Sequence, residues 1–188
     1  MPTVNEARFK NTVLAILTVR PGLGSVQLRK ALIIADALHN TLFGKSITGT
    51  RYIKFKYGPI PDRDASGILD SMYYDENLID INEEVEGSTT KNSYYALQEP
   101  NDKIFTEEEY KIIKFAAGVT EKYSATKLSD MTHDEVYNNT PLREEIPLDR
   151  VCTMTITGHF NTPDFTEEEK RHLIEVLSSN EAGKFTFI

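Results

Sequence analysis

The sequence predicts a mainly helical α+β domain, in which winged-helix-like N-terminal helices and a β-hairpin pack against further helices. Apolar residues recur at helical spacing in several segments, whereas residues 51–57 alternate as a half-buried strand does. The length of 188 residues allows one adequate core. We expect one domain over residues 1–145 and a C-terminal extension, a strand plus a helix packed on it, over residues 146–188.

Two helices are expected at the N-terminus. Thr3 and Glu6 have the spacing of a capping box, which predicts that the first helix begins there, and Pro21 ends it. Ser25 can cap the second helix, and Gly44 supplies its left-handed C-terminal cap. The second helix has the most regular apolar seam, so we expect it at the centre of the fold. The seam consists of Leu28, Ala31, Leu32, Ala35, Leu38 and Leu42.

Strands are expected in the middle of the chain. After the strand at residues 51–57, Gly58, Pro59, Ile60 and Pro61 predict a rigid corner, because prolines remove ladder donors. Asp62 or Asp64 can start a short third helix. A hairpin is predicted next, with its turn at residues 86–88.

The second part of the chain carries further helix starts. Thr106 and Glu109 form a capping box, flanked by Phe105 and Tyr110 as a hydrophobic staple, and Ser124 can cap another helix. Residues 142–146 are expected to form a short helical or irregular link between prolines. A strand over residues 151–158 and a last helix after residue 165 complete the prediction.

Charge is unevenly distributed along the chain. The first 60 residues carry nine Lys and Arg against two acidic residues, a net charge of +7, and the rest carries −15. Such polarity can steer a charged partner if the two parts occupy different faces. No apolar run approaches the roughly 18–20 residues that span a bilayer, and no secretion signal is visible, so we expect a cytoplasmic protein without a membrane partner.

Candidate chemistry is sparse. Asp36 and His39 share a helix face, and with His133 they could in principle form a metal or acid–base site. A histidine bonded to a carboxylate in a buried polar corner explains the same pattern, and the sequence contains no Walker loop, nucleophile elbow or zinc-protease helix. We therefore predict no catalytic residue, no metal ligand, no cofactor and no enzyme activity.

Tyrosines offer candidates for partner binding. The adjacent pairs at positions 73–74 and 94–95 cannot all point inward, and tyrosine is favoured at protein interfaces. The candidate partner-binding residues are Tyr73, Tyr74, Tyr94 and Tyr137.

Two blocks of sequence resemble a known family. The block from Ala35 to Pro61, which includes the runs ADALH, ITG and YGPIP, and a second block, LSDMTHDE at residues 128–135, are similar to the SocA-like Panacea domain of bacterial and phage antitoxins. One departure is Val136-Tyr137-Asn138, where the family often carries a tryptophan. The resemblance covers residues from about 5 to about 140.

The resemblance implies a protein that neutralises a cognate toxin by direct contact. It also implies that shared motif residues build the scaffold: Asp36, His39, Gly44, Thr48, Gly49, Tyr52, Tyr57, Gly58, Pro59, Pro61 and His133. A winged-helix-like DNA-binding regulator and a phage-associated adaptor are the alternatives, and homodimer formation and nucleic-acid binding stay open.

Overall fold

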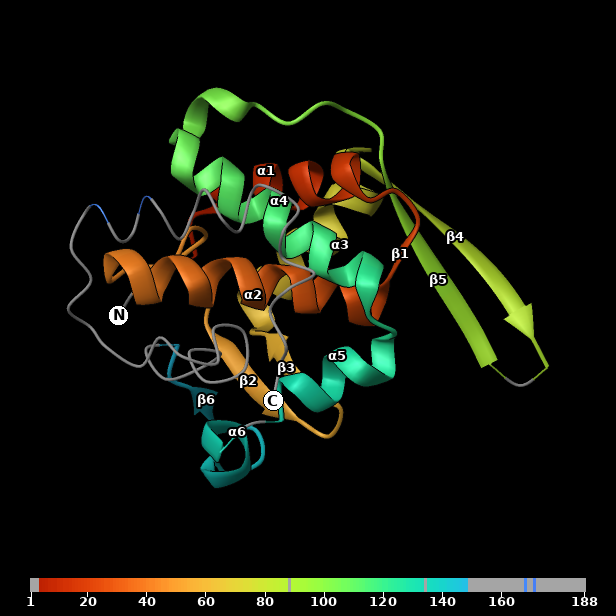
Figure 1. The fold of residues 1–188 in the computed structure, drawn as a ribbon. Coiled ribbons are helices and arrows are strands. Elements are labelled where there is room, and N and C mark those ends of the chain that lie inside the picture. The colour runs from red at the N-terminus through yellow and green to blue at the C-terminus, as the bar shows by residue number, and fades with distance from the viewer. Residues whose placement is uncertain (1–3, 88, 134, 149–167, 169–170, 172–188) are drawn as a thin grey trace.

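The computed structural model describes residues 4–87, 89–133, 135–148, 168 and 171, and Figure 1 shows their arrangement. The helices are α1 (Glu6–Val19), α2 (Ser25–Phe43), α3 (Arg63–Tyr74), α4 (Glu107–Lys122), α5 (Ala125–Met131) and α6 (Glu135–Asn139), with a 3₁₀ turn at Asp102–Ile104. The strands are β1 (Leu23–Gly24), β2 (Tyr52–Phe55), β3 (Gly58–Pro61), β4 (Ile79–Glu86), β5 (Thr89–Ala96) and β6 (Glu145–Ile146). The predicted α+β class is confirmed, and helices predominate.

The helix α2 lies in the middle of the molecule, as its apolar seam predicts. Figure 1 shows α1 and α4 along one side of α2, with α5 and the β2–β3 hairpin along the other. All six residues of the predicted seam are at most 2 % exposed. Because full burial of one such leucine contributes about 1.5–3 kcal/mol, α2 provides the surface on which the other elements assemble.

Most predicted helix starts are confirmed, and two are shifted. Asn5, not Thr3, is the N-cap of α1, and its side chain accepts a hydrogen bond from the Arg8 amide. Gly24, not Ser25, precedes α2, because the chain first forms the short strand β1. The capping box of Thr106 and the caps Ser124 and Asp62 are present as predicted.

The larger sheet has the order β1-β5-β4 and is antiparallel throughout. The hairpin β4–β5 forms around the predicted turn, and eight residues of β4 pair with eight residues of β5. Figure 1 shows this hairpin projecting away from the helices. The side of the sheet near α1 and α3 is packed, whereas the far end of the hairpin extends into solvent.

The smaller sheet has the order β3-β2-β6 and corrects two predictions. Residues 58–61 form the strand β3 rather than a corner, and Glu145–Ile146 pairs with β2 as β6 rather than forming a helical link. The prolines are compatible with β3 because of their register. Asp62 N–H donates to Arg51 O, so the alternation of an antiparallel ladder leaves Pro59 and Pro61 at positions whose nitrogens face away from β2.

The strand β2 is buried on the side of Tyr52, which is 0 % exposed, while Phe55 on the other side is 44 % exposed. The predicted strand over residues 151–158 lies outside the described residues, as do most of the helix predicted after residue 165 and most of the predicted extension, and the domain boundary stays a prediction. Within the described residues, no helix has both the length and the apolar character that crossing a bilayer requires.

Candidate functional site

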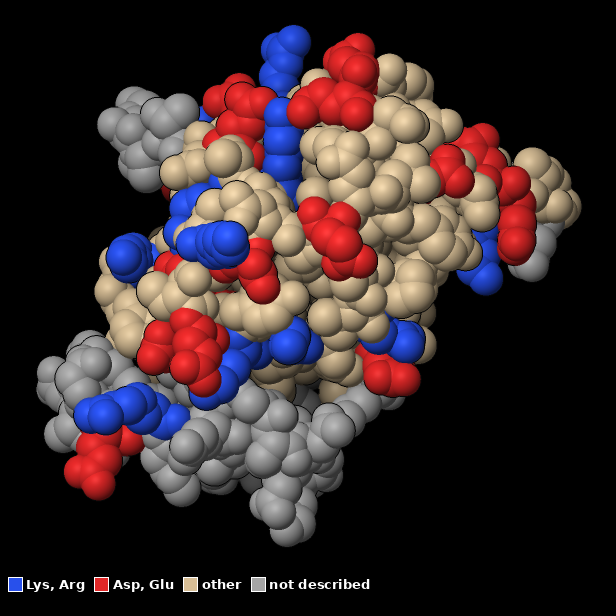
Figure 2. Space-filling model, turned by 90° about the horizontal axis from the view of Figure 1, so that it is seen from above, with Lys and Arg blue, Asp and Glu red and all other residues tan. Residues whose placement is uncertain are grey.

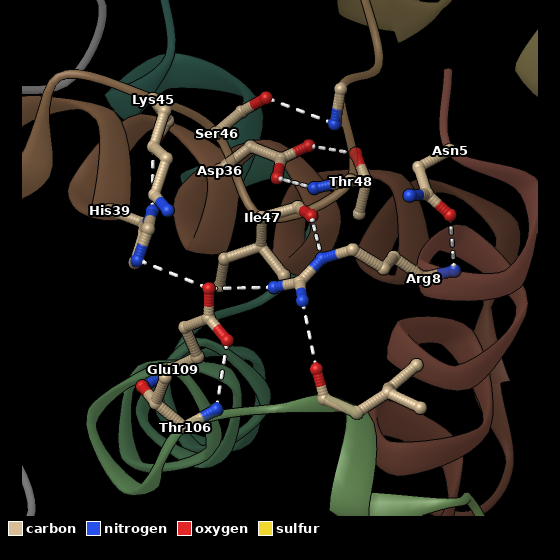
Figure 3. A network of polar contacts seen from close by, with 12 residues as sticks. Asn5, Arg8, Asp36, His39, Lys45, Ser46, Ile47, Thr48, Thr106 and Glu109 are labelled. Atoms are coloured by element: carbon tan, nitrogen blue, oxygen red, sulfur yellow. Dashed lines mark hydrogen bonds and ion pairs between the residues drawn. The ribbon is translucent and has the colours of Figure 1, made fainter.

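A buried carboxylate joins α2 to the loop and strand that follow it. Asp36 is 0 % exposed and accepts hydrogen bonds from the Thr48 amide at 2.9 Å, the Thr48 hydroxyl at 2.5 Å and the Tyr52 hydroxyl at 2.8 Å. Figure 3 shows the pair of bonds between Asp36 and Thr48. Burial raises the pKa of the Asp36 carboxyl, although these donors act in the opposite direction.

One helical turn further on, His39 connects the same helix to α4. Its Nδ1 lies 2.6 Å from the Lys45 carbonyl oxygen, which can only accept, so Nδ1 carries the proton. Its Nε2 lies 3.5 Å from Glu109 Oε1, and Figure 3 shows the ring aimed at that carboxylate. Glu109 belongs to the capping box of α4, so one side chain both caps the helix and faces the histidine.

Arg8 completes this polar corner from α1. Its Nη2 lies 2.6 Å from Glu109 Oε1, while Nε and Nη1 donate to the backbone oxygens of Ile47 and Ile104 at 2.7 and 2.8 Å. These contacts, drawn in Figure 3, connect α1, α4 and the loop after α2. These contacts therefore hold α1, α4 and the loop after α2 relative to one another.

The charges within the corner follow from burial and pairing. Burial lowers the pKa of His39, which favours the neutral ring. Burial alone would raise the pKa of Glu109, but hydrogen bonds from Arg8 and from the Thr106 amide bring it below its ordinary value. At neutral pH, an ionised Glu109 is thus balanced by Arg8 beside a neutral histidine.

A second polar cluster lies on the opposite side of α2. Lys30 is only 1 % exposed, and its Nζ donates to Thr132 Oγ1 at 2.6 Å. Gly58 lies against this ammonium group, because a Cβ built on Gly58 would meet Lys30 Nζ at 2.1 Å. The glycine also has a φ of +108°, so both its conformation and its neighbour exclude a side chain.

His133 belongs to this second cluster and not to the corner of Asp36 and His39. Its ring stacks on Tyr137 with centroids 4.2 Å apart, and its buried Nε2 has no hydrogen-bond partner among the described residues. Burial lowers the pKa of His133 as well. The three residues considered for a metal or acid–base site are therefore not brought together, and no group of three metal-ligating side chains occurs within the described residues.

Three glycines and Tyr57 are also among the residues named as scaffold. Gly44, Gly49 and Gly58 all have positive φ angles, of 69°, 74° and 108°. Tyr57 differs from the rest, because it is 69 % exposed at the turn between β2 and β3. Its backbone oxygen, rather than its ring, is what contacts α5, through the Ser129 hydroxyl at 3.4 Å.

The four candidate tyrosines differ in exposure. Tyr74 is 77 % exposed, and the partly buried ring of Tyr73 meets it edge-on at 4.8 Å. Tyr94 is partly buried in β5. Tyr137 is only 6 % exposed, because its hydroxyl donates to the Phe55 backbone oxygen at 2.5 Å and its ring covers His133. Among these four, only Tyr74 therefore exposes most of its side chain to solvent.

Sequence reasoning missed Arg8, Lys30 and the second role of Glu109. The capping box identified Glu109 locally, but its contacts with Arg8 and His39 join residues far apart in sequence, and no local pattern carries that information. Of these residues, Lys30 is the one that the sequence could have revealed. A lysine between Arg29 and Ala31 inside a continuous apolar seam lies close to the buried face, so it requires a partner.

Surface charge does not separate into two faces on the side seen in Figure 2. Lys and Arg side chains alternate there with Asp and Glu side chains over the body of the molecule. Acidic side chains also line the projecting β4–β5 hairpin. On this side the acidic residues of the β4–β5 hairpin form a local acidic region.

Comparison with known proteins gives one match. The family model described as "Antitoxin SocA-like, Panacea domain" matches residues 28–137, a range that includes both hairpins and both polar clusters apart from Arg8. No curated protein and no solved structure matches the chain significantly. The family match covers more than half of the 188 residues, and it agrees with the resemblance of the two sequence blocks. The chain therefore belongs to the SocA-like Panacea antitoxin domain family.

Proposed function

We propose that this chain neutralises a cognate toxin by direct, stoichiometric binding. The observation that carries the proposal is the antitoxin family match over residues 28–137, because an antitoxin family implies a toxin partner. The two polar clusters support a binding role. They hold α1, α2, α4 and the β2–β3 hairpin in fixed positions, and a preorganised surface loses little conformational entropy when a partner binds.

The tyrosine side chains on α3 are the proposed contact residues. Tyr74 is the most exposed of them, and Tyr73 packs against it from the same helix. Tyrosine suits an interface because it supplies a large rigid ring and a hydroxyl at low entropic cost. Tyr94 and Tyr137 would act indirectly, since Tyr94 is partly buried and Tyr137 is buried.

Co-expression tests this function. The chain is produced together with the product of the adjacent reading frame, and growth and complex formation on size exclusion are measured. We expect growth arrest by that product alone, rescue by this chain, and co-elution at a fixed ratio. Growth arrest unaffected by this chain, with no complex, would rule the function out.

A pair of variants tests the contact surface. Tyr74→Ala should weaken the complex about tenfold or more, because truncating a central aromatic residue commonly costs over 1.4 kcal/mol. Tyr57→Ala is the matched control, since this tyrosine is 69 % exposed on the other sheet. Equal affinities for the two variants, measured by titration calorimetry, would contradict the placement of the surface on α3.

A DNA-binding regulator is the second candidate. The strand order β1-β5-β4 favours it, because β1 lies between α1 and α2 and pairs with a hairpin that follows α3, as a winged helix requires. The charges oppose it. The helix α3 carries Asp64 and Asp70, and the hairpin carries Glu83 and Glu84, all of which repel phosphate. A gel shift on the chain's own promoter at low salt decides the matter, because no shift would remove this candidate.

A further inference from the structure

The outer edge of β4 is open within the described part of the chain. The sheet order β1-β5-β4 makes β4 an edge strand, with β5 as its only strand neighbour among the described residues. Leu97 N–H donates to Leu78 O on the β4 side of β5, and Gly22 N–H donates to Tyr94 O on the β1 side. The alternation of an antiparallel ladder then places the backbone groups of Ile81, Glu83 and Val85 on the side away from β5.

One of these outward backbone amides already has a side-chain hydrogen-bond partner. The Ile81 amide donates to Asp80 Oδ1 at 2.9 Å, which confirms that this amide points away from the ladder. Beyond it, Glu83 and Val85 present an amide and a carbonyl each, on the part of the hairpin that projects from the body in Figure 1. Val85 is 74 % exposed, so the core does not use this β-branched side chain.

We propose that the outer edge of β4 binds an extended, basic segment of the toxin by strand addition. This inference rests on the proposed function, because it assigns a surface to the same partner. In strand addition, the main chain of the partner pairs with the free backbone groups and its side chains decide specificity. The segment would pair at Glu83 and Val85 and displace the Asp80 carboxylate from the Ile81 amide.

The negative charge along the edge of β4 favours a basic binding segment. Glu83 faces Asn92 across the hairpin, and no described Lys or Arg forms an ion pair with Glu83. Glu84 faces Lys91, and Figure 2 shows the acidic side chains along this hairpin. A basic segment places opposite charges beside these carboxylates, whereas a second copy of β4 would bring glutamates next to glutamates. The edge thus favours a basic partner over self-association.

Backbone exchange and one pair of variants test the site. In the free chain the amides of Glu83 and Val85 should exchange rapidly, while the Glu84 amide is protected by β5. In the complex with the product of the adjacent reading frame, exchange at Glu83 and Val85 should slow about tenfold or more. Unchanged exchange at both amides in a formed complex would overturn the inference while leaving the proposed function intact.

Val85→Pro removes the outward amide without removing a ladder bond to β5, and Val85→Thr keeps both the amide and the branched shape. We expect Val85→Pro to weaken the complex tenfold or more and Val85→Thr to match the wild type. If Val85→Pro alters the circular dichroism spectrum, Glu83→Lys replaces it and should weaken binding comparably. If Val85→Pro, or Glu83→Lys in its place, binds as tightly as the wild type, the inference is overturned. A wild-type chain that neither binds nor neutralises the toxin would overturn the proposed function together with it.

Discussion

At the scale of single residues, Asp36 shows how one buried polar group joins separate segments of the interior. Its carboxylate is buried with three donors, and each donor belongs to the loop or strand that must return along α2. Sequence reasoning identified Asp36 and His39 as parts of a buried polar corner. It could not identify their partners, because these lie outside the helix. Asp36 bonds Thr48 and Tyr52, and His39 faces Glu109, which is 70 positions away.

Removing one donor to Asp36 should therefore destabilise the fold. Tyr52→Phe leaves a buried carboxylate with one bond fewer, and we expect a loss of about 1–3 kcal/mol in the free energy of unfolding. Tyr57→Phe is the control, since Tyr57 is 69 % exposed, and should change stability by less than about 0.5 kcal/mol. Urea denaturation measures both, and equal effects would contradict the role given to Asp36.

Gly58 offers a second test among single residues. Gly58→Ala forces a Cβ onto Lys30 Nζ and onto a φ of +108°, so we expect a loss of more than about 1 kcal/mol. Gly67 lies in α3 with open space around it, and Gly67→Ala should gain about 0.5–1 kcal/mol. Thermal unfolding that moves in the same direction for both variants would contradict this account.

At the scale of elements, most local signals were reliable, whereas strand register could not be predicted. The capping box of α4, the cap Ser124 and the seam of α2 were predicted because each depends on residues within a few positions. The strand β3 was missed, because Pro59 and Pro61 were interpreted as breakers. Whether a proline breaks a strand depends on which neighbour its nitrogen faces, and that is fixed by pairing with β2.

The register of β3 can be tested at the residue between the two prolines. The alternation that frees Pro59 and Pro61 directs the Ile60 amide into the ladder with Ile53. Ile60→Pro should therefore destabilise the chain by about 1–3 kcal/mol more than Ile60→Ala, which keeps the amide. Chemical denaturation of the two variants gives this difference. A difference near zero would mean that β3 pairs in another register.

At the scale of the whole molecule, polar contacts between distant segments hold the helices in place. Arg8, His39 and Glu109 come from three helices, and the family match covers the last two of them. The sequence predicted the family, the α+β class and the central helix, because these depend on motifs and periodicity. The contacts between α1, α2 and α4 could not be predicted, since they depend on how the completed fold brings the segments together.

The stability of the molecule should depend on pH through His39 and His133. Burial lowers the folded-state pKa of His39 and His133, so the unfolded state takes up protons first as the pH falls below about 6.5. The stability they contribute is present above that pH and is lost below it. Asp36, with its raised pKa, acts in the opposite direction, so the comparison must be made between variants.

His39→Asn isolates one of these contributions, because the asparagine amide can still donate to the Lys45 carbonyl. Between pH 6.5 and 5 the wild type should lose stability relative to this variant, by at most about 1.4 kcal/mol per pH unit for one proton. Glu109, Arg8 and Lys45 surround the ring and are the same in both proteins. Parallel stability curves for the two proteins would show that His39 does not titrate differently on unfolding.

The prolines of β3 also affect edge-to-edge association between molecules at high concentration. A sheet grows by recruiting another chain to unoccupied main-chain donors, and Pro59 and Pro61 have none to offer on the flank away from β2. Pairing of another chain at that flank would lack these donor bonds. Concentrated solutions of this protein should therefore resist amyloid-type polymerisation through the β3 edge, whatever happens at the hairpin.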